Sequence, residues 1–439
     1  MTEPMRSQRK DRPLQLAPFR ALRYSPDVVP DLAAVTCPPY DVIGDGGIAT
    51  WEAADPYNVV RLILPRGSPR GDRYEHAARD LNDWLAQGVL RVDSEPALYV
   101  YEHSGNAGTA VGLVGAISLH DPADNVVLAH EDVLPGPVAD RTELMAATRA
   151  QLEPILLTYG GGGPASAAVD AALLTEPIIA TKTADGAQHR IWRLISPTTI
   201  AEIEADLAGR QALIADGHHR YAAYRALRER AGQPTDQVAV RYGLAMLVDA
   251  DSHPLRLGSI HRSIAGLPLS EATAAAARGF HTVALLPTEL DPVGVLSEAG
   301  HAGPAWVLSD GRHSAVLRHP IRDRVEACLP AGRSRTWQNL DATIAYEFLL
   351  PRLFGVDDAD RRVTYHHEAR AALDRARRLG GVALLLKPAS HDDVLAVAAA
   401  GERMPRKSTS FGPKPRTGLL MRLLTELAVP WPAPAAVHR

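Results

Sequence analysis

The densest group of potentially reactive side chains lies in the segment Leu213–Arg230, LIADGHHRYAAYRALRER. Its apolar start is typical of a strand end, Asp216-Gly217 is typical of a tight turn, and the following residues repeat at helical spacing. Such a strand, turn and helix start gathers unpaired backbone N–H groups, which favour an anion such as phosphate. Side chains able to clamp a phosphate or transfer a proton follow directly, namely His218, His219 and Arg220. We interpret these five residues, 216–220, as a functional segment, the DGHHR box, rather than a capped helix with two structural histidines.

A second candidate group follows the apolar residues VVLA, where His130 and Glu131 stand at the end of a predicted strand. A carboxylate in this position is a candidate general base or metal ligand. An exposed acidic loop is the alternative interpretation. Further along, Arg141 precedes residues that repeat at helical spacing.

Two loops complete the candidates. Residues 37–43, CPPYDVI, form a rigid turn in which two prolines restrict the backbone near Tyr40 and Asp41, a structural feature by itself. Residues 404–414, MPRKSTSFGPK, form a cationic, hydroxyl-rich loop suited to phosphate, although a solvated basic loop fits equally. Its candidate residues are Arg406, Lys407, Ser408, Thr409 and Lys414. The glycines at 160–163 lack the Lys-Ser/Thr of a phosphate-binding P-loop, so we favour a structural loop there.

Metal binding has weaker support. No His-Glu-x-x-His helix or cysteine pair supplies zinc-ligand spacing. Mg²⁺ needs only one or two carboxylates together with substrate phosphates, and Glu131 and Asp216 are candidates for that task.

Composition limits the class of protein. The 439 residues exceed the usual size of one core, so two domains are expected. Lys and Arg number 47 against 51 for Asp and Glu, which argues against a dedicated nucleic-acid binder. Two cysteines, a polar N-terminus and the lack of an apolar run of about 18 residues indicate a cytoplasmic protein without a membrane span.

Hydrophobic periodicity predicts an α/β fold with mixed sheets. Strands are expected at 98–102 and 111–119, a hairpin at 305–308 and 314–317, helices at 336–354 and 365–379, and a buried strand at 381–386. The predicted organisation is a disordered tail at 1–15, a first α/β domain at 16–265 with the His-Glu pair and the box, a second at 266–428 with the MPRKST loop, and a tail at 429–439.

At these residues the chain resembles the bacterial and archaeal family known as domain of unknown function 1015. The matching segments are PFRALRY, CPPYDVI, DPYNVVRL, AHEDV, ADRTELMAATRAQLEPI, ADGHHRYAAY and MPRKST, spread over residues 18 to 420. The box is similar to that of free serine kinases in the ParB/sulfiredoxin superfamily, which implies a ParB/sulfiredoxin-like core. The resemblance implies substrate and phosphate contacts for Asp216, His218 and Arg220, and makes Glu131 the candidate for the glutamate that acts on the hydroxyl.

These features together predict nucleotide-dependent phosphoryl transfer to a small hydroxyl-bearing metabolite such as free serine, with ATP or ADP and Mg²⁺ as cofactors. Glu131, Asp216 and His218 are the predicted catalytic residues. The predicted phosphate-binding residues are Gly217, His219, Arg220, Arg406, Lys407, Ser408 and Thr409, and the predicted supporting residues are His130, Asp41, Tyr40 and Arg141. Two alternatives stay open: a phosphatase or metal-dependent hydrolase, and a nucleotide-binding or DNA-associated regulator without turnover.

Overall fold

The computed structural model describes residues 13–44, 46–67, 72–106, 108–232, 238–357 and 360–424. The predicted tail at 429–439 and residues 1–12 of the predicted N-terminal tail lie outside the described residues. The chain divides into a first unit, Met1–Arg256 with Gly412–Arg439, and a second unit, Leu257–Phe411. The sequence predicted a second domain of 266–428. The structure instead returns the chain to the first unit from residue 412 onward, because the last described strand pairs with a strand of that unit.

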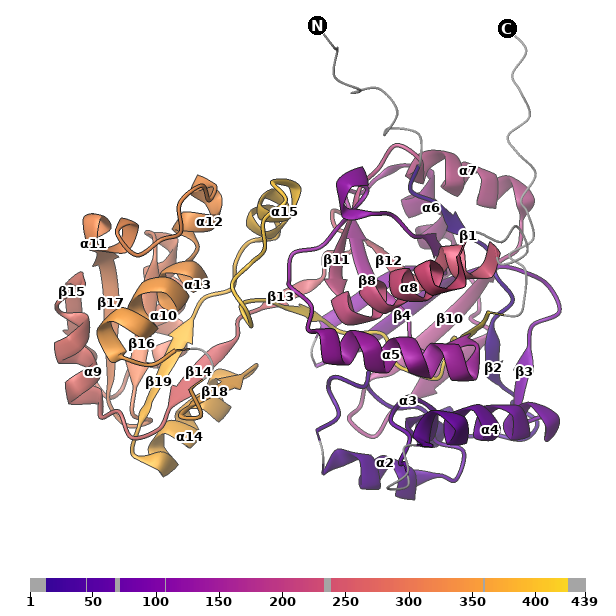
Figure 1. Ribbon diagram of the computed structural model, residues 1–439, viewed down its shortest axis with the longest axis horizontal. Coiled ribbons are helices and arrows are strands. Elements are labelled where there is room, and N and C mark those ends of the chain that lie inside the picture. Colours follow the sequence, from indigo (N-terminus) through magenta and orange to yellow (C-terminus); the bar gives the residue numbers. More distant parts are fainter. Residues whose placement is uncertain are drawn as a thin grey trace, which may run out of the picture. The chain divides into compact units, whose positions relative to one another are not determined.

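The first unit is built around one mixed sheet. Its strands are β1 (Leu16–Ala17), β4 (Leu98–Gly105), β5 (Gly108–Ser118), β6 (Val127–Leu128), β8 (Ile155–Tyr159), β9 (Ile179–Lys182), β10 (Gln188–Leu194), β11 (Ala212–Asp216) and β12 (Tyr242–Asp249). In the described residues the order is β6-β11-β8-β12-β5-β4-β10-β9, and β1 pairs with β5. Figure 1 shows several of these strands, among them β4, β8, β10, β11 and β12. β4 and β5, which correspond to the strands expected at 98–102 and 111–119, pair antiparallel. All residues of β8 and β11 are buried, which explains their continuous apolar sequences.

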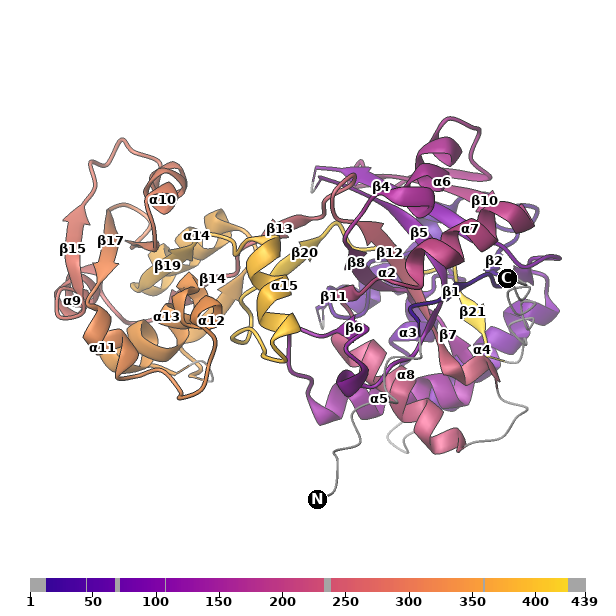
Figure 2. The same ribbon diagram turned by 90° about the horizontal axis from the view of Figure 1, so that it is seen from above.

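Helices and short strands surround this sheet. The helices are α1 (Leu32–Val35), α2 (Gly47–Ala54), α3 (Val60–Ile63), α4 (Arg73–Ala86), η1 (Pro122–Asp124), α5 (Pro135–Thr148), α6 (Gly163–Leu173), α7 (Pro197–Leu207), α8 (His218–Ala231) and η2 (Val238–Arg241). The short strands are β2 (Leu22–Tyr24), β3 (Leu90–Val92), β7 (Ala150–Gln151) and β21 (Arg422–Leu423). β2 pairs with β3, and β21 pairs with β7 beside α4 (Figure 2). α8 lies next to α5 and buries Tyr221, Ala223, Tyr224 and Leu227 in the core of the unit (Figure 1).

The second unit contains an antiparallel sheet. Its strands are β14 (His261–Ile264), β15 (Phe280–Leu285), β16 (Ala305–Ser309), β17 (Ser314–Pro320), β18 (Val363–His366) and β19 (Val382–Leu386), while β13 (Arg256–Gly258) and β20 (Ser410–Gly412) lie where the chain passes between the units. The helices are α9 (Leu269–Ala276), α10 (Pro292–His301), α11 (Arg322–Glu326), α12 (Arg335–Asn339), α13 (Asp341–Ile344), η3 (Ala345–Phe354), α14 (Ala369–Leu379) and α15 (His391–Ala399). The strand order is β15-β17-β16-β19-β14-β18 in the described residues.

Two helix predictions in this unit were wrong in their extent. Residues 336–354 are not one helix, because Leu340 is extended (φ −62°, ψ 134°) between α12 and α13, and η3 is a π-helix with Pro351 inside it. Residues 365–366 belong to β18, where antiparallel pairing with β14 overrides the helical pattern. The predicted hairpin is confirmed as β16 and β17, and the buried strand as β19.

Both units therefore combine helices with sheets, and the predicted α/β class is confirmed. Within the described part of the chain, no helix has the length and apolar character that a membrane crossing requires.

Candidate functional site

The parallel pairing of β6 with β11 brings the two main candidate groups to one edge of the first sheet. Val127 lies opposite Ala212 and Leu128 opposite Leu213. Parallel neighbours end at the same edge, so the residues after β6 and those after β11 come together there. The 84 residues between Glu131 and Asp216 do not separate them in space, because β8 lies on the other side of β11, β9 and β10 lie further along the sheet, and β7 pairs outside it with β21.

Direct contacts join the two groups. Nδ1 of His218 lies 3.9 Å from Oε2 of Glu131, and the rings of His130 and His218 meet edge to face at 4.5 Å. The backbone N–H of His130 donates to Nε2 of His218 at 3.4 Å, so the neutral His218 ring carries its proton on Nδ1, facing Glu131. Nε2 of His219 likewise accepts from the backbone N–H of Leu134 at 3.0 Å. Glu131, whose side chain is 33% exposed, thus lies beside the His218 ring at a solvent-accessible position.

The carboxylate of Asp216 is held by two cations. Its Oδ2 accepts from Nη2 of Arg220 at 2.7 Å, and its Oδ1 is ion-paired with Nζ of Lys414. Arg220 also donates to the carbonyl of Pro154 at 2.6 Å and is only 3% exposed. Arg220 therefore orients Asp216 from below the surface. A direct phosphate contact by Arg220 stays a prediction that requires it to exchange one of these partners.

Gly217 makes the sharp exit from β11 possible. Its φ of +92° is in the left-handed region that favours glycine. An added Cβ would lie 2.8 Å from Cγ2 of Ile155, so a side chain at this position would also clash with Ile155. No side chain caps the start of α8 at this residue, and the first turn of the helix begins directly with the box. The phosphate-binding role of these amides stays a prediction.

The turn at 37–43 packs against the box, so Tyr40 and Asp41 lie in the site. Nζ of Lys414 is 3.2 Å from Oδ2 of Asp41 as well as being paired with Asp216. Burial raises the pKa of Asp41, but the nearby cations Lys414 and Arg220 outweigh it and hold that pKa below its usual value. Burial lowers the pKa of Lys414, but the two carboxylates outweigh it and raise that pKa, so the ammonium group is charged at neutral pH.

The Tyr40 ring lies close to two guanidinium groups. Arg141 stands 4.4 Å and Arg220 5.9 Å from its centroid, a cation–π arrangement on a ring whose pKa burial raises to about 12. Arg141 is buried and donates to the carbonyl of Ile63 at 2.7 Å. The two predicted supporting residues, Tyr40 and Arg141, therefore form a packed wall beside the box.

Sequence reasoning missed Glu153 and misplaced Lys414. Glu153 is 5% exposed, accepts from the backbone N–H of Tyr40 at 2.9 Å and from Oγ1 of Thr417 at 3.2 Å, and raises the pKa of Arg220 against the opposing effect of burial. Its position in QLEPI, immediately before β8, was the available signal. Lys414 was grouped with the MPRKST loop because it is near in sequence, but it belongs to the first unit.

The MPRKST loop belongs to the second unit and is described there by itself. Arg406 and Lys407 are exposed, and Lys407 has a positive φ of 53°. Nη2 of the buried Arg262 donates to the carbonyls of both residues at 3.3 and 3.4 Å, which fixes the backbone of the loop. The side chains of Ser408 and Thr409 are buried. A phosphate contact by these four loop residues stays a prediction.

In the glycine loop before α6, backbone N–H groups donate to carboxylates of the protein itself. The N–H of Gly161 donates to Asp251 at 2.8 Å and that of Gly162 donates to Asp249 at 3.1 Å. Hydrogen bonds from Ser166 and from backbone N–H groups lower the pKa of Asp249 despite its partial burial. These contacts favour the structural interpretation of the loop.

Magnesium ligation by Asp216 does not fit the arrangement of its oxygens, since Lys414 and Arg220 each bind one of them. Across the described ranges, no three His, Cys, Asp or Glu side chains gather as a metal-binding group. Of the two predicted Mg²⁺ ligands, Glu131 is more accessible, with a side chain 33% exposed against 11% for Asp216, and ligation of Mg²⁺ by Glu131 stays a prediction.

Three comparisons with known proteins add the following findings. A family model described as "Protein of unknown function (DUF1015)" matches residues 16–343. No curated protein matches. Similar solved structures include a free serine kinase variant in complex with ADP, which is 12% identical and is covered over 65% of this chain and 84% of that chain with a TM-score of 0.33. SbnI with a C-terminal truncation from Staphylococcus aureus is 12% identical over 71% of this chain and 87% of that chain, with a TM-score of 0.35. A conserved hypothetical protein from Pyrococcus furiosus is 11% identical over 65% and 87%, with a TM-score of 0.31.

Proposed function

This chain belongs to the DUF1015 family of proteins of unknown function, as its sequence predicted, and we propose that it transfers a phosphoryl group from a nucleotide to the hydroxyl of a small metabolite. The observation that carries the proposal is the 3.9 Å approach of Glu131 to His218 at the start of α8. It joins an accessible carboxylate, a histidine and a helix N-terminus in one place. Phosphoryl transfer needs these parts because its catalysis consists mainly of positioning and charge stabilisation.

In this proposal Glu131 acts on the acceptor. The hydroxyl proton passes to the Glu131 carboxylate, the acceptor oxygen bonds to phosphorus, and the bond from phosphorus to the bridging nucleotide oxygen breaks. A proton on Nδ1 of His218 would face Glu131, 3.9 Å away, and would orient the carboxylate. His219 and the first amides of α8 contact the phosphates, because anions are stabilised at helix N-termini.

The charge balance of the site bears on its ligands. Asp41 and Asp216 are matched by Lys414 and Arg220, so these four side chains add no net positive charge for a phosphate. A magnesium ion carried by the nucleotide would supply that charge when bound. A small zwitterion such as free serine suits a site whose carboxylates and cations are already balanced. Asp41, whose side chain is 35% exposed, would receive its ammonium group, and Lys414 its carboxylate.

The test uses the purified full-length chain with ATP or ADP, MgCl₂ and L-serine, followed by ³¹P NMR for the appearance of a phosphate ester. We expect ester formation that depends on both nucleotide and acceptor. The variant Glu131→Gln keeps the shape of the side chain but cannot accept the proton, so turnover should fall by roughly 10²–10⁴-fold. The control Glu229→Gln removes an exposed carboxylate at the far end of α8 and should leave turnover unchanged.

Three results would contradict the proposal. Unchanged turnover in Glu131→Gln would remove Glu131 from the chemistry. Release of inorganic phosphate from a phosphorylated metabolite without nucleotide would indicate a phosphatase. Nucleotide binding without ester formation, tested over a panel of small hydroxy and amino acids, would indicate a regulator.

A further inference from the structure

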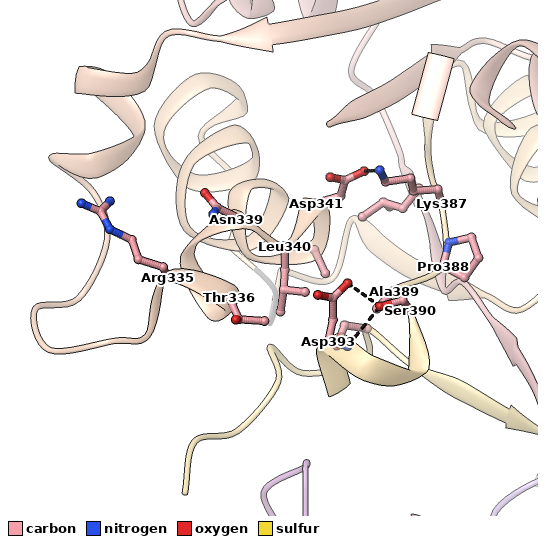
Figure 3. A pocket seen from close by; sticks show the side chains of 13 residues that line it. Arg335, Thr336, Asn339, Leu340, Asp341, Lys387, Pro388, Ala389, Ser390 and Asp393 are labelled. Carbon is pink, nitrogen blue, oxygen red and sulfur yellow. Dashed lines mark hydrogen bonds and ion pairs between the residues drawn. The ribbon is translucent and has the colours of Figure 1, made fainter. Parts of the chain in front are cut away.

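A cavity of about 440 Å³ lies within the second unit, away from the residues discussed above except Ser408. Its wall is formed by α12, the start of α13, the end of β19 and the start of α15 (Figure 3). The volume falls in the lower part of the range of about 300–1,000 Å³ that small-molecule sites occupy. The wall is more polar than that of a usual small-molecule site, because charged, amide and hydroxyl side chains outnumber the apolar ones.

The lysine in the wall is already engaged. Nζ of Lys387 donates to the carbonyls of Gly300 and Gly303 at 3.2 and 3.3 Å, next to the end of α10. The same Nζ lies 3.6 Å from Oδ2 of Asp341. Lys387 therefore holds the loop after α10, and its ammonium group is shared between two carbonyl groups and the Asp341 carboxylate.

Asp341 is a buried carboxylate with incomplete partners. The residue is 8% exposed, and its two contacts, Lys387 and the backbone N–H of Ala305 at 3.4 Å, both involve Oδ2. Among the residues that the structure describes, none forms a hydrogen bond or ion pair with its Oδ1. The indole N–H of Trp306 donates to the Asp341 carbonyl at 3.1 Å, which fixes the backbone of this residue. A rigid carboxylate with an unpaired oxygen thus lines the cavity.

A second carboxylate stands on the same wall. Ser390 donates to Oδ2 of Asp393 at 2.7 Å and accepts from the Asp393 backbone N–H at 3.0 Å, which holds this side chain at the start of α15 (Figure 3). Burial raises the pKa of Asp341 to about 6, Lys387 lowers it, and the charge of Asp393 adds a smaller upward effect. An additional positive charge in the cavity would relieve the cost of keeping Asp341 ionised.

We infer that this cavity binds a small molecule that carries a protonated primary amine, with the Asp341 carboxylate as its counter-ion. An ammonium group has three N–H donors, and the wall offers acceptors for them at Oδ1 of Asp341 and at the hydroxyls of Ser390 and Ser408. The side chains of Leu340 and Leu386 provide an apolar surface for a short carbon chain. Amines and amino acids share this chemistry. The inference does not depend on the proposed phosphoryl transfer.

The test compares three probes of similar size on the full-length chain: n-butylamine, L-2-aminobutyrate and n-butanol. Isothermal titration calorimetry gives the affinity, and hydrogen–deuterium exchange locates the site. We expect at least one of the two amines to bind and the alcohol not to bind, with protection at 340–343 and 387–393. The relative affinity of the two amines distinguishes an amine site from an amino-acid site.

Variants decide whether Asp341 is the counter-ion. Asp341→Asn removes the charge with little change of shape and should weaken amine binding by about tenfold or more. Ala389→Phe, which fills the cavity from its wall, should block binding while keeping Asp341, and it covers the case in which Asp341→Asn does not fold. Asp374→Asn on the surface of α14 is the matched control and should bind as the wild type does.

Binding of butanol as tight as that of butylamine would overturn the inference, as would unchanged affinity in Asp341→Asn or the absence of any amine binding at millimolar concentration. Protection confined to the first unit would also overturn it. Asp216→Asn should leave amine binding in the second unit unchanged, so failure of the proposed phosphoryl transfer and failure of this inference give different results.

Discussion

Asp216 and Asp341 are equally buried but differ in how their charge is balanced. Asp216 is 9% exposed, and each of its oxygens is held by a cation, Arg220 or Lys414. Asp341 is 8% exposed, and only one of its oxygens has partners. A buried charge is costly unless it is paired and hydrogen-bonded. The charge of Asp216 is therefore balanced within the chain, whereas Asp341 can accept a cationic partner from outside the chain.

The two regions also differ in how they are assembled from the sequence. The network around Asp216 draws on the turn at 37–43, the start of β8, α8 and the returning segment at 414. The cavity around Asp341 draws on 335–342, 386–393 and Ser408. In both regions the polar groups lie where helices start. Only in the first region are both oxygens of the buried carboxylate paired with cations of the chain itself. Three predictions test this difference.

The largest effect is expected from breaking the network in the first unit. Arg220→Ala leaves Asp216 and Glu153 buried without the guanidinium between them, which should lower the free energy of unfolding by about 3–5 kcal/mol. Because the chain has two units, the loss should be measured by hydrogen–deuterium exchange on β11 and α8 rather than from one global transition.

The control for this change lies on the same helix. Arg230 pairs with Glu143 on the surface, with both side chains at least half exposed, so Arg230→Ala should cost no more than about 1 kcal/mol. Equal losses in the two variants would show that the buried network does not set the stability of the first unit.

A smaller effect is expected in the second unit, where replacing Asp341 should change the free energy of unfolding in the opposite direction. Burial raises the pKa of Asp341 from 3.8 to about 6, so its contribution to stability is complete below pH 4 and is lost as the pH rises to 6. The shift of about 2 pKa units corresponds to on the order of 3 kcal/mol. Asp341→Asn removes this pH dependence. Between pH 4 and pH 7, the free energy of unfolding of the wild type should therefore fall by that amount relative to that of the variant.

Urea unfolding at several pH values, combined with hydrogen exchange on α13 and β19, measures the gain. A difference between variant and wild type that stays constant over this pH range would show that Asp341 is adequately paired. Adding butylamine at pH 7 should reduce the difference, because the ligand binds the wild type more tightly than the variant.

Sequence patterns predicted the individual strands, turns and helices of the first region better than the way these elements come together. The strand, turn and helix around the box are confirmed, because apolar runs, glycine and helical spacing are local signals. The approach of Glu131 to His218 depends on the order of strands in the sheet, with β6 at the edge beside β11, and local patterns do not encode that order. Glu153 was missed because a lone carboxylate before a strand does not reveal that it is buried.

The second region was harder to predict. The pattern at 336–354 indicated one helix, but the break at Leu340 makes Asp341 the first residue of a new helix that lines the cavity. Apolar periodicity is nearly the same for a broken and an unbroken helix, so the position of Asp341 could not be recognised. The sequence neighbours of Lys414 were likewise misleading, since the chain crosses from one unit to the other between Phe411 and Gly412.

The smallest expected effect tests a single contact of the network in the first unit. Lys414 is the main cation beside Asp41 and holds the pKa of that carboxyl low against the effect of burial. Lys414→Met keeps most of the packing but removes the charge, so the pKa of Asp41 should rise. Lys182→Met, at an exposed position of β9, is the control and should leave this pKa unchanged.

Carbon-detected NMR titration of the Asp41 carboxyl measures the pKa in both variants. In the wild type the lowered pKa of Asp41 stabilises the fold above its ordinary pKa, and this contribution is lost as the pH falls through the lowered value. In Lys414→Met that loss should begin at higher pH. An Asp41 pKa that does not respond to Lys414→Met would leave Arg220 as the residue that lowers it, and Lys414 would then balance the charge of Asp216 alone.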